Sequence, residues 1–446
     1  VRGHARDFDT WAGMGATGWS GADVLPYFKR METSHQDGGI GGEEGWRGTD
    51  GPLHVQRGPA VNPLFSAFIE AGRQAGYGVT DDYNGSRQEG FGLMEQTIHK
   101  GQRWSTAEAY LKPALKRKNV SLVRGLARRV VIENHRATGV EIEAHKQIQL
   151  VKARREVVLA ASAVNSPKLL MLSGIGPAGH LAEHGIEVVA NREGVGANLQ
   201  DHIGVTVNVV APEEVPIPEY PSADPAAVAQ WRFDRTGPAT YFAGNSIGFF
   251  TTRGGDQPEF ELLGSYQQSM QDDQGRDLFD GVNGPRAGYS WTLVLLHPAS
   301  HGTVSLTSAD PAAPPAIDPG YLKDPGDVAA LREGLQAVFR LTRTTTLRSL
   351  TEQVSPGADS TDEELEEFIR QTATTLFHPV GTARMGSVGD ATAVVDSQLR
   401  VQGVSRLRVV DASVMPTLTS GHTMAPTIYI AERAAEFITR GSADAV

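Results

Sequence analysis

The chain has 446 residues, of which 40% are apolar and 21% charged, as expected for a globular protein with a sizeable core. Its net charge of −11 argues against nucleic acid, an anionic membrane or an acidic polymer as a partner. Because cysteine is absent, disulfides, zinc–thiolate sites, iron–sulfur clusters and thiol nucleophiles are excluded. No apolar run approaches the length of a membrane span and no signal peptide precedes Val1, so we expect a cytoplasmic protein. Because Val1 is not Met, we expect the true start of the protein to lie upstream.

The first 120 residues predict short helices separated by glycine-rich turns. A capping box at residues 20–23 begins a helix that ends at Met31. The glycine-rich stretch 38–51 predicts a loop, and an initial proline begins a helix over 63–76. A second capping box, at residues 105–108, begins another helix.

The middle of the chain changes from helices to strands. Residues 120–140 predict strands joined by a turn. The nearly continuous apolar run 156–161 predicts a central strand covered on both faces, and the Ser-Pro pair after it predicts a short helix over 166–174. From 203 to 308, apolar and polar residues alternate between many turns, which predicts an antiparallel sheet.

Helices return in the C-terminal third, where they are predicted over 327–343, 361–374 and 426–439. The buried strand 407–411 ends in an acid and is followed by a loop and the last helix, an order typical of dinucleotide-binding folds. Parallel-type strands therefore flank an antiparallel block. We expect an α/β (α+β) fold in which a Rossmann-like nucleotide-binding domain is interrupted by a substrate domain.

Three short motifs have a structural interpretation beside a functional one. Gly174–Gly179 spells G-x-G-x-x-G but follows a helix rather than a strand, which favours a helix C-cap and turn. His180–His184 has the H-x-x-E-H spacing of some zinc proteases, but no third ligand stands out, so no metal site is predicted. For the glycine- and amide-rich loop 194–202, a surface turn and a ligand-binding loop stay equally open.

Two histidines, His378 and His422, each lie in a loop of Gly, Pro and Thr residues. His422 precedes the last predicted helix, whose N-terminus carries a partial positive charge and free N–H donors suited to a negatively charged cofactor. A neutral histidine can take a hydroxyl proton as hydride leaves the adjacent carbon. The pair therefore predicts acid–base chemistry beside a cofactor, although a lone histidine is more often structural.

In order along nearly the whole chain, the sequence resembles the glucose–methanol–choline (GMC) oxidoreductases, FAD enzymes that oxidise alcohols. The matching strings are VRGH at 1–4, DFDTW at 7–11, GPL at 51–53, QEGFG at 88–92, SAVNSP at 162–167, SGIG at 173–176, NLQDH at 198–202 and VDASVMP at 410–416. The resemblance implies an FAD-binding domain of the glutathione-reductase type and a substrate domain with a large antiparallel sheet. We place residues 1–53, 95–205 and 358–446 in the FAD-binding domain, and 54–94 and 206–357 in the substrate-binding domain.

The resemblance implies His378 as the catalytic base and His422 as the residue that holds the substrate oxygen. A His–His pair is similar to the aryl-alcohol-oxidase-like members, and histidine at the second position could share the proton-accepting role. The implied FAD contacts are Asp411, Ala412, His422, Thr423, Met424, Ala127 and Asn198.

The sequence departs from the family pattern in two places. Relatives begin with a βαβ unit that bears the G-x-G-x-x-G for the FAD pyrophosphate, and no such unit precedes the match at residues 1–4. We therefore expect the C-terminal part of a longer enzyme, with a separate N-terminal fragment as one alternative partner. The common Pro-Lys-Ser-Arg-Gly run reads Pro-Ala-Ser-His-Gly at 298–302 and loses two positive charges.

The expected reaction is FAD-dependent oxidation of a primary or secondary alcohol to an aldehyde or ketone, with proton abstraction by histidine and hydride transfer to flavin N5. The expected electron acceptor is O2, a quinone or a dye. A hydroxynitrile-lyase-like enzyme and a non-catalytic remnant are the alternatives. Tyr241, Phe242 and Trp291 hint at an apolar or aromatic alcohol, although ordinary sheet packing is favoured for all three, and choline is a default expectation.

Overall fold

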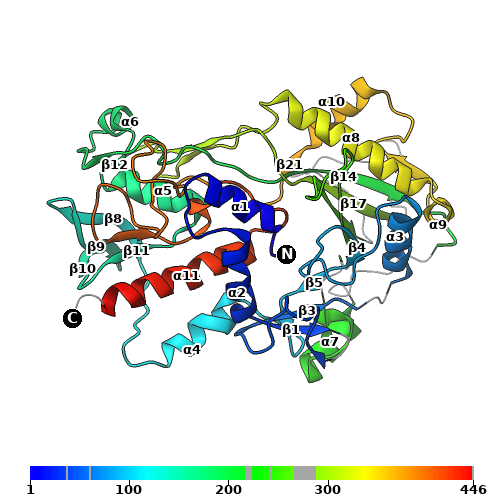
Figure 1. The fold of residues 1–446 in the computed structure, drawn as a ribbon, viewed down its shortest axis with the longest axis horizontal. Helices are drawn as coiled ribbons and strands as arrows, with labels where there is room; N and C mark the ends of the chain where they lie inside the picture. Colours follow the sequence, from blue (N-terminus) through cyan, green and yellow to red (C-terminus); the bar gives the residue numbers. More distant parts are fainter. Residues whose placement is uncertain are drawn as a thin grey trace.

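The structure, a computed structural model, is an elongated molecule with a hydrophobic core toward each end (Figure 1). It describes residues 1–36, 39–59, 62–215, 224–241, 244, 246–265 and 288–443. The first core draws mainly on residues 8–53, 109–195 and 380–434, and the second on 64–91 and 203–369. On this basis we propose two domains that follow the expected division in outline but not at its bounds. Residues 303–318 pack at the first end, and residues 362–375 pack at the second.

The N-terminal segments lie between the two ends (Figure 1). They comprise α1 (Ala5–Gly13), α2 (Gly21–Met31), β1 (Glu32–Gln36), β2 (Gly39–Ile40), β3 (Leu53–Arg57), β5 (Glu95–Gln96), β6 (Ile98–His99), β7 (Gln102–Arg103), the π-helix Ala107–Leu111 and α4 (Lys112–Leu115). Strand β1 runs parallel to β3, and β5 joins β3 from the other side. Buried Arg47 binds Glu32 at 2.8 Å and Glu95 at 2.7 Å, which ties β1 to β5.

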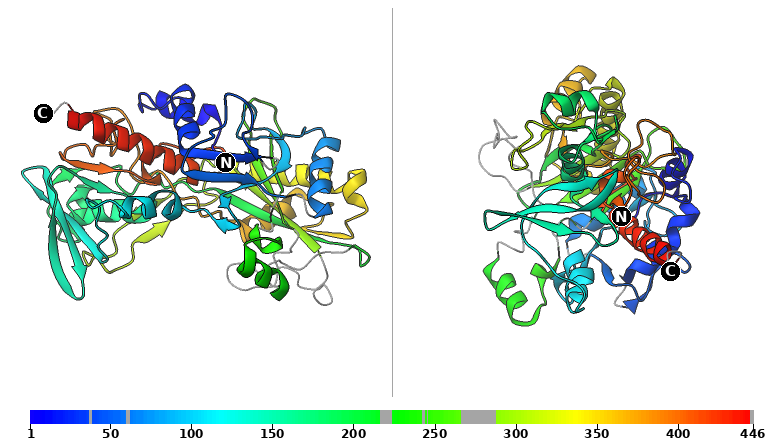
Figure 2. Two further views of the ribbon diagram at one scale, coloured as in Figure 1. Left: turned by 90° about the horizontal axis from the view of Figure 1, so that it is seen from below. Right: turned by 90° about the vertical axis from the view of Figure 1, so that its left-hand side faces the viewer.

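The end that expectation assigns to nucleotide binding is built on short parallel strand pairs, a three-stranded antiparallel sheet and a short antiparallel pair. Its elements are β8 (Leu126–Glu133), β9 (Arg136–Ala144), β10 (Gln147–Lys152), β11 (Val157–Leu159), α5 (Ser162–Leu172), β12 (Ile175–Gly176), α6 (Ala178–Glu183), β13 (Ala190–Asn191), β18 (Thr303–Ser305), β19 (Ala316–Asp318), β22 (Leu407–Val409), the 3-10 helix Ala412–Val414 and α11 (Met424–Ala443). Strand β11 pairs in parallel with β22, and the β8–β10 sheet projects from the body (Figure 2). The long helix α11 begins near the middle of the molecule and runs outward to the C-terminus at this end (Figure 1).

The opposite end is a seven-stranded sheet in the order β20-β14-β17-β16-β15-β4, with β21 also paired to β14. Its elements are α3 (Pro63–Gln74), β4 (Gly90–Leu93), β14 (Ile203–Val210), α7 (Pro225–Asp234), the 3-10 helix Pro238–Thr240, β15 (Ser246–Phe250), β16 (Phe260–Ser265), β17 (Gly288–Leu295), α8 (Pro325–Thr342), α9 (Thr345–Arg348), β20 (Gln353–Ser355), α10 (Asp362–Thr372) and β21 (Thr374–Thr375). Every strand pair in this sheet is antiparallel, which confirms the sheet expected from the alternating pattern. Helices α3, α8 and α10 pack beside it (Figure 1).

Two predictions about helix starts need correction, although a helix does begin beside residue 105 as expected. The capping box expected at 105–108 does not form, because Glu108 pairs with Lys112 one turn later and the chain enters a π-helix. Pro167 does not begin a helix but lies inside α5, five residues after its start. Proline cannot donate to the carbonyl of Ala163, and the hydroxyl of Thr382 donates to that oxygen instead, at 2.6 Å.

Two predictions about strands also need correction. Residues 39–40 form a short strand against β1 within the stretch predicted as a loop. The strand at 156–161 was predicted to be covered on both faces, but Val158 of β11 is 41% exposed, so one face is open in the described chain. Val157 and Leu159 point into the first core, as a half-buried strand requires.

Candidate active site

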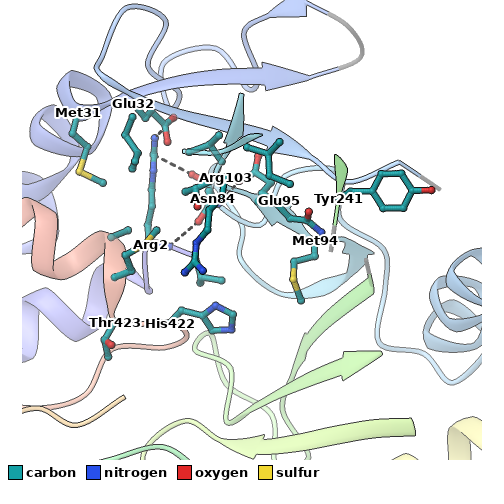
Figure 3. A pocket seen from close by; sticks show the side chains of 18 of the residues that line it. Arg2, Met31, Glu32, Asn84, Met94, Glu95, Arg103, Tyr241, His422 and Thr423 are labelled. Carbon is teal, nitrogen blue, oxygen red and sulfur yellow. Dashed lines mark hydrogen bonds and ion pairs between the residues drawn. The ribbon is translucent and has the colours of Figure 1, made fainter. Parts of the chain in front are cut away.

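A cavity of about 820 Å³ lies among β1, β3, β5, β6 and the start of α11. It is lined by His378 and His422 together with Val1, Arg2, Met31, Glu32, Leu53, Val55, Asn84, Met94, Glu95, Gln96, Thr97, Ile98, Gly101, Arg103, Trp231, Ala239, Thr240, Tyr241, Phe377, Thr423, Met424 and Ala425. Figure 3 shows His422 and Thr423 on the side of the cavity away from Glu95 and Glu32. The two histidines that the sequence predicts as a pair therefore face one cavity.

His378 is positioned by the edge of the large sheet. Strand β21 pairs with β14 so that Thr375 lies opposite Ile203, which brings the loop after β21 beside the segment before β14. The backbone N–H of His378 donates to Asp201 Oδ1 at 2.7 Å. The hydroxyls of Thr375 and Tyr321 both donate to Asp201 Oδ2 at 2.5 Å. Asp201 is thereby held in place, and it holds the loop of His378.

His202 determines which ring nitrogen of His378 carries a proton. His202 Nε2 lies 3.1 Å from the carbonyl oxygen of Leu296, which can only accept, so Nε2 is the protonated nitrogen of His202. In a neutral ring His202 Nδ1 must then be the acceptor, and His378 Nδ1 lies 3.0 Å from it. His378 therefore donates through Nδ1–H, and its Nε2 keeps a free lone pair. This is the tautomer that a proton-accepting histidine needs.

Burial keeps both imidazoles neutral. Burial, followed by the positive charge of His422, lowers the pKa of His378 to about 4. Complete burial, followed by the neighbouring His378, lowers the pKa of His202 well below its usual value. A neutral His202 is the condition that fixes the tautomer of His378, so the geometry and the protonation states agree.

His422 is paired with a buried carboxylate. Its Nε2 lies 2.9 Å from Oε1 of Glu261, a residue of β16 that is 0% exposed. Burial acts to raise the pKa of Glu261, but the charge and hydrogen bond of His422 outweigh it and leave this pKa lowered. The rings of His422 and His378 are 5.1 Å apart between centroids. His378 thus contacts a neutral partner, His202, whereas His422 contacts an anion, Glu261.

The loop before α11 is anchored by Asp7 of α1. The backbone N–H of Ser420 donates to Asp7 Oδ2 at 2.7 Å, and its hydroxyl donates to Oδ1 at 2.9 Å. Gln88 donates to the carbonyl oxygen of Ser420 at 2.6 Å. The first backbone bond of α11 runs from the N–H of Thr427 to the oxygen of Thr423, which leaves the N–H groups at Met424 and before it without helical partners. These donors lie at the cavity.

The other residues predicted to contact the cofactor lie away from the cavity lining. The carboxylate of Asp411 accepts bonds from Ser162, Ser166 and Ser413, so it joins the end of β22 to the start of α5. Asn198 donates to the carbonyl oxygens of Gly381 and Pro416, each at 3.2 Å. Ala412 begins the 3-10 helix after β22, and Ala127 lies on β8. Their contacts to a cofactor stay predictions.

The residues at the cavity fit the flavin part of FAD. A volume of about 820 Å³ is in the range of small-molecule sites, and its lining mixes apolar side chains with a few polar groups. The free N–H donors at Thr423 and Met424, at the positive end of the 20-residue helix α11, suit the negative charge of a reduced flavin. Thr423 and Met424 would therefore hold this ring beside the histidine pair.

The structure shows the contacts of the three short motifs noted in the sequence. In the H-x-x-E-H segment, the backbone N–H of Leu306 donates to His180 Nε2 at 3.0 Å, and His184 Nε2 lies 3.2 Å from the oxygen of Leu306. The rings of His180 and His184 therefore both contact the backbone of Leu306. Gly174 follows α5 with φ of 81°, which confirms the predicted helix-end turn. The loop 194–202 supplies Asp201 and His202, which both contact His378.

Of the predicted pocket aromatics, Tyr241 lines the cavity and Trp291 does not. Trp291 is 2% exposed and packs in the second core, as the sheet-packing interpretation expects. Phe242 lies outside the described residues. The sequence missed Glu261, because one acid in an apolar strand gives no signal until the sheet brings it to His422.

Comparisons with known proteins identify the family of the chain. A family model described as GMC oxidoreductase matches residues 1–204, and a second with the same description matches 298–431. The chain belongs to the GMC oxidoreductases. It is therefore an FAD-dependent alcohol oxidoreductase that acts on CH–OH groups, as expected from the sequence.

Similar proteins include an oxygen-dependent choline dehydrogenase of Brucella ovis, 47% identical over 450 residues that cover 98% of this chain and 78% of the relative. A relative of the same name from Sinorhizobium fredii is 48% identical over 447 residues, with the same coverage. Among solved structures, a formate oxidase of Aspergillus oryzae has a TM-score of 0.87 at 28% identity and covers 100% of this chain and 82% of that one. Pyridoxine 4-oxidase from Mesorbium loti has a TM-score of 0.84 at 29% identity and covers 98% of this chain and 81% of that one.

No helix among the described residues has the length and hydropathy of a membrane span.

Proposed function

We propose that this GMC oxidoreductase oxidises a primary or secondary alcohol with His378 as the proton acceptor. The observation that carries the proposal is the chain Leu296–His202–His378, which fixes the proton of His378 on Nδ1 and leaves a lone pair on Nε2. The alcohol O–H gives its proton to that nitrogen while a hydride leaves the adjacent carbon, and the product is an aldehyde or ketone. When bound, FAD supplies the two-electron acceptor for this hydride.

His422 and Glu261 form the second half of the proposed machinery. His422 Nε2 contacts Glu261, so the ring is oriented by that carboxylate. From this position His422 holds the substrate oxygen, and its positive form stabilises negative charge that develops there. Glu261 Oε1 lies 2.9 Å from His422 Nε2, and the Glu261 side chain is itself removed from solvent, at 1% exposed.

For the substrate we propose choline or a similar cationic alcohol. The two choline dehydrogenases named above share 47% and 48% identity with this chain, and both are named oxygen-dependent, so O2 is the proposed acceptor, with a quinone as the alternative. The cavity lining includes Tyr241, an aromatic ring of the kind that can contact a quaternary ammonium group.

A panel of alcohols tests this proposal on the FAD-loaded enzyme. Choline, an uncharged isostere with a tert-butyl head and an aryl alcohol are mixed with enzyme under anaerobic conditions, and the visible flavin absorbance is followed. Bleaching fastest with choline, with aldehyde formed in equal amount, supports the proposal. Equal bleaching with choline and its uncharged isostere contradicts the cationic substrate, and absence of bleaching with every alcohol contradicts the reaction.

A further inference from the structure

Three histidines meet on the outer side of the strands that wall the cavity. His35 lies on β1, His54 on β3 and His99 on β6, so three separate segments contribute one ring each. Along β3 and β6 the neighbours Leu53, Val55 and Ile98 line the cavity, whereas the histidines are absent from its lining. Since successive side chains of a strand point to opposite faces, the cluster lies behind the cavity wall rather than in the active site.

The ring nitrogens of this cluster are close enough to share one ion. One ligand atom from each of His35, His54 and His99 lies within 4.8 Å of the other two. His35 Nε2 and His54 Nδ1 are 2.8 Å apart, and the rings of His54 and His99 stack at 3.6 Å between centroids, 9° from parallel. Trp104 packs edge-on against both His54 and His99 and holds their position. All three histidines are half-buried, so a small ion has access.

Burial favours the neutral form of two of the three rings. Burial, followed by the charges of His99 and His35, lowers the pKa of His54 to about 4. Burial, followed by His35 and Lys100, also lowers the pKa of His99. Neutral imidazoles have free lone pairs, and imidazole is a preferred ligand of zinc, copper and nickel.

We propose that His35, His54 and His99 form a binding site for a divalent transition-metal ion, with zinc as the best fit. Three histidines with one position left for water match a known zinc arrangement, at Zn–N distances of about 2.0–2.1 Å. Because His54 and His99 are nearly parallel, one ring turns about its terminal torsion to direct its nitrogen at the ion, and that torsion is soft in histidine. The ion replaces the hydrogen bond between His35 and His54.

The bound ion has a structural role in this proposal. It fastens β1, β3 and β6 to one another behind the surface that carries Glu32, Leu53 and Ile98 into the cavity. The H-x-x-E-H segment, by contrast, offers no such site, because His180 and His184 both contact the backbone of Leu306. The inference is independent of the proposed substrate.

Equilibrium dialysis of the FAD-loaded enzyme against zinc chloride, with metal quantified by mass spectrometry, tests the site. The wild type is expected to bind one zinc per chain with a raised melting temperature. His54→Ala and, separately, His99→Ala each remove a ligand of the ion. Loss of a residue that only contacts a metal ligand weakens binding by roughly 10–100-fold, and we expect each of these variants to bind zinc more weakly than that. His301→Ala, which removes an exposed histidine elsewhere, is the matched control and should bind as the wild type does.

Cobalt supplies a second readout that does not depend on activity. Cobalt bound by three imidazoles should give visible absorption bands, measured on enzyme whose flavin spectrum is subtracted, and the His54→Ala and His99→Ala variants should lack them. Retention of FAD by each variant shows that it is folded. The proposal is overturned if the wild type binds no zinc, if both variants bind it as tightly as the wild type, or if only His378→Ala removes the binding.

Discussion

At the scale of single residues, the proposed chemistry depends on a hydrogen-bond direction rather than on a distance. His378 faces the cavity, but its role follows from His202, which is buried and touches no cavity surface. The carbonyl oxygen of Leu296 fixes the proton of His202, and His202 fixes the proton of His378. In the proposed mechanism, the ring of His378 reacts and the ring of His202 orients it.

Replacing His202 by alanine tests this orientation. The Nδ1–H of His378 loses its acceptor, so the ring is no longer held in the reactive tautomer. We expect kcat to fall by roughly 10–100-fold, as is usual when an orienting partner is lost, with little change in KM. Steady-state kinetics of the FAD-loaded variant measure both constants, and His301→Ala is the control. An unchanged kcat would show that His202 has only a packing role.

The pKa of His378 predicts the acid limb of the pH profile. The base acts when it is neutral, and burial lowers its pKa to about 4. We therefore expect kcat/KM to stay level from neutral pH down to about pH 5 and to fall only below that, because the free-enzyme profile reports the pKa of the base. A profile measured over this range contradicts the assignment if it falls with a midpoint near 6.5, the ordinary value for histidine.

At the scale of elements, the site is a meeting of segment ends. Strand β21 brings His378, β16 brings Glu261, and the loop before α11 brings His422. Local signals located neighbouring helices, since the capping box predicted at Ser20 forms and the helix predicted from residue 361 has Thr361 as its N-cap. Local signals failed where a distant group decides the outcome. The hydroxyl of Thr382 donates to the carbonyl oxygen of Ala163, and this bond allows a proline inside α5.

The anchor of the α11 loop can be tested at Asp7. Replacing Asp7 by alanine leaves the buried N–H and hydroxyl of Ser420 without their acceptor. Each unsatisfied buried group costs about 1–3 kcal/mol of the free energy of unfolding, and the loop that carries His422 should loosen. Urea denaturation and kcat together measure the effect.

Asp359→Ala is the control for this substitution. Its carboxylate is 97% exposed and pairs only with Arg343 among the ion pairs of the described chain. We expect a change within about 1 kcal/mol, as for exposed ion pairs. If Asp7→Ala is no more destabilising than Asp359→Ala, the anchor does not contribute to stability.

At the scale of the whole molecule, the cavity wall depends on a buried ion cluster. Arg47 contacts Glu32, Asp82 and Glu95, whose side chains are 4%, 8% and 5% exposed. The sequence predicted the large sheet and the histidine pair, because periodicity and flanking loop residues are local features. It could not predict this cluster, because its members come from four segments that only the tertiary fold brings together.

Replacing Arg47 by methionine keeps much of the side-chain volume but leaves three carboxylates without their central cation. Breaking a buried ion pair in this way costs about 3–5 kcal/mol of the free energy of unfolding. The urea midpoint of the FAD-loaded enzyme measures the loss. Arg253→Met, at an arginine that is 55% exposed and pairs with Glu333, should cost less than about 1 kcal/mol. Equal midpoints for the two variants would contradict the importance of the cluster.

The reductive half-reaction of His378→Ala tests the central claim most directly. FAD-loaded wild type and variant are mixed anaerobically with choline, or with the best alcohol of the panel, and flavin bleaching is followed by stopped flow. We predict that the variant keeps its bound flavin but is reduced about 10²–10⁴-fold more slowly, the usual contribution of a general base. Reduction of the variant at the wild-type rate would contradict the assignment of His378 as the proton acceptor.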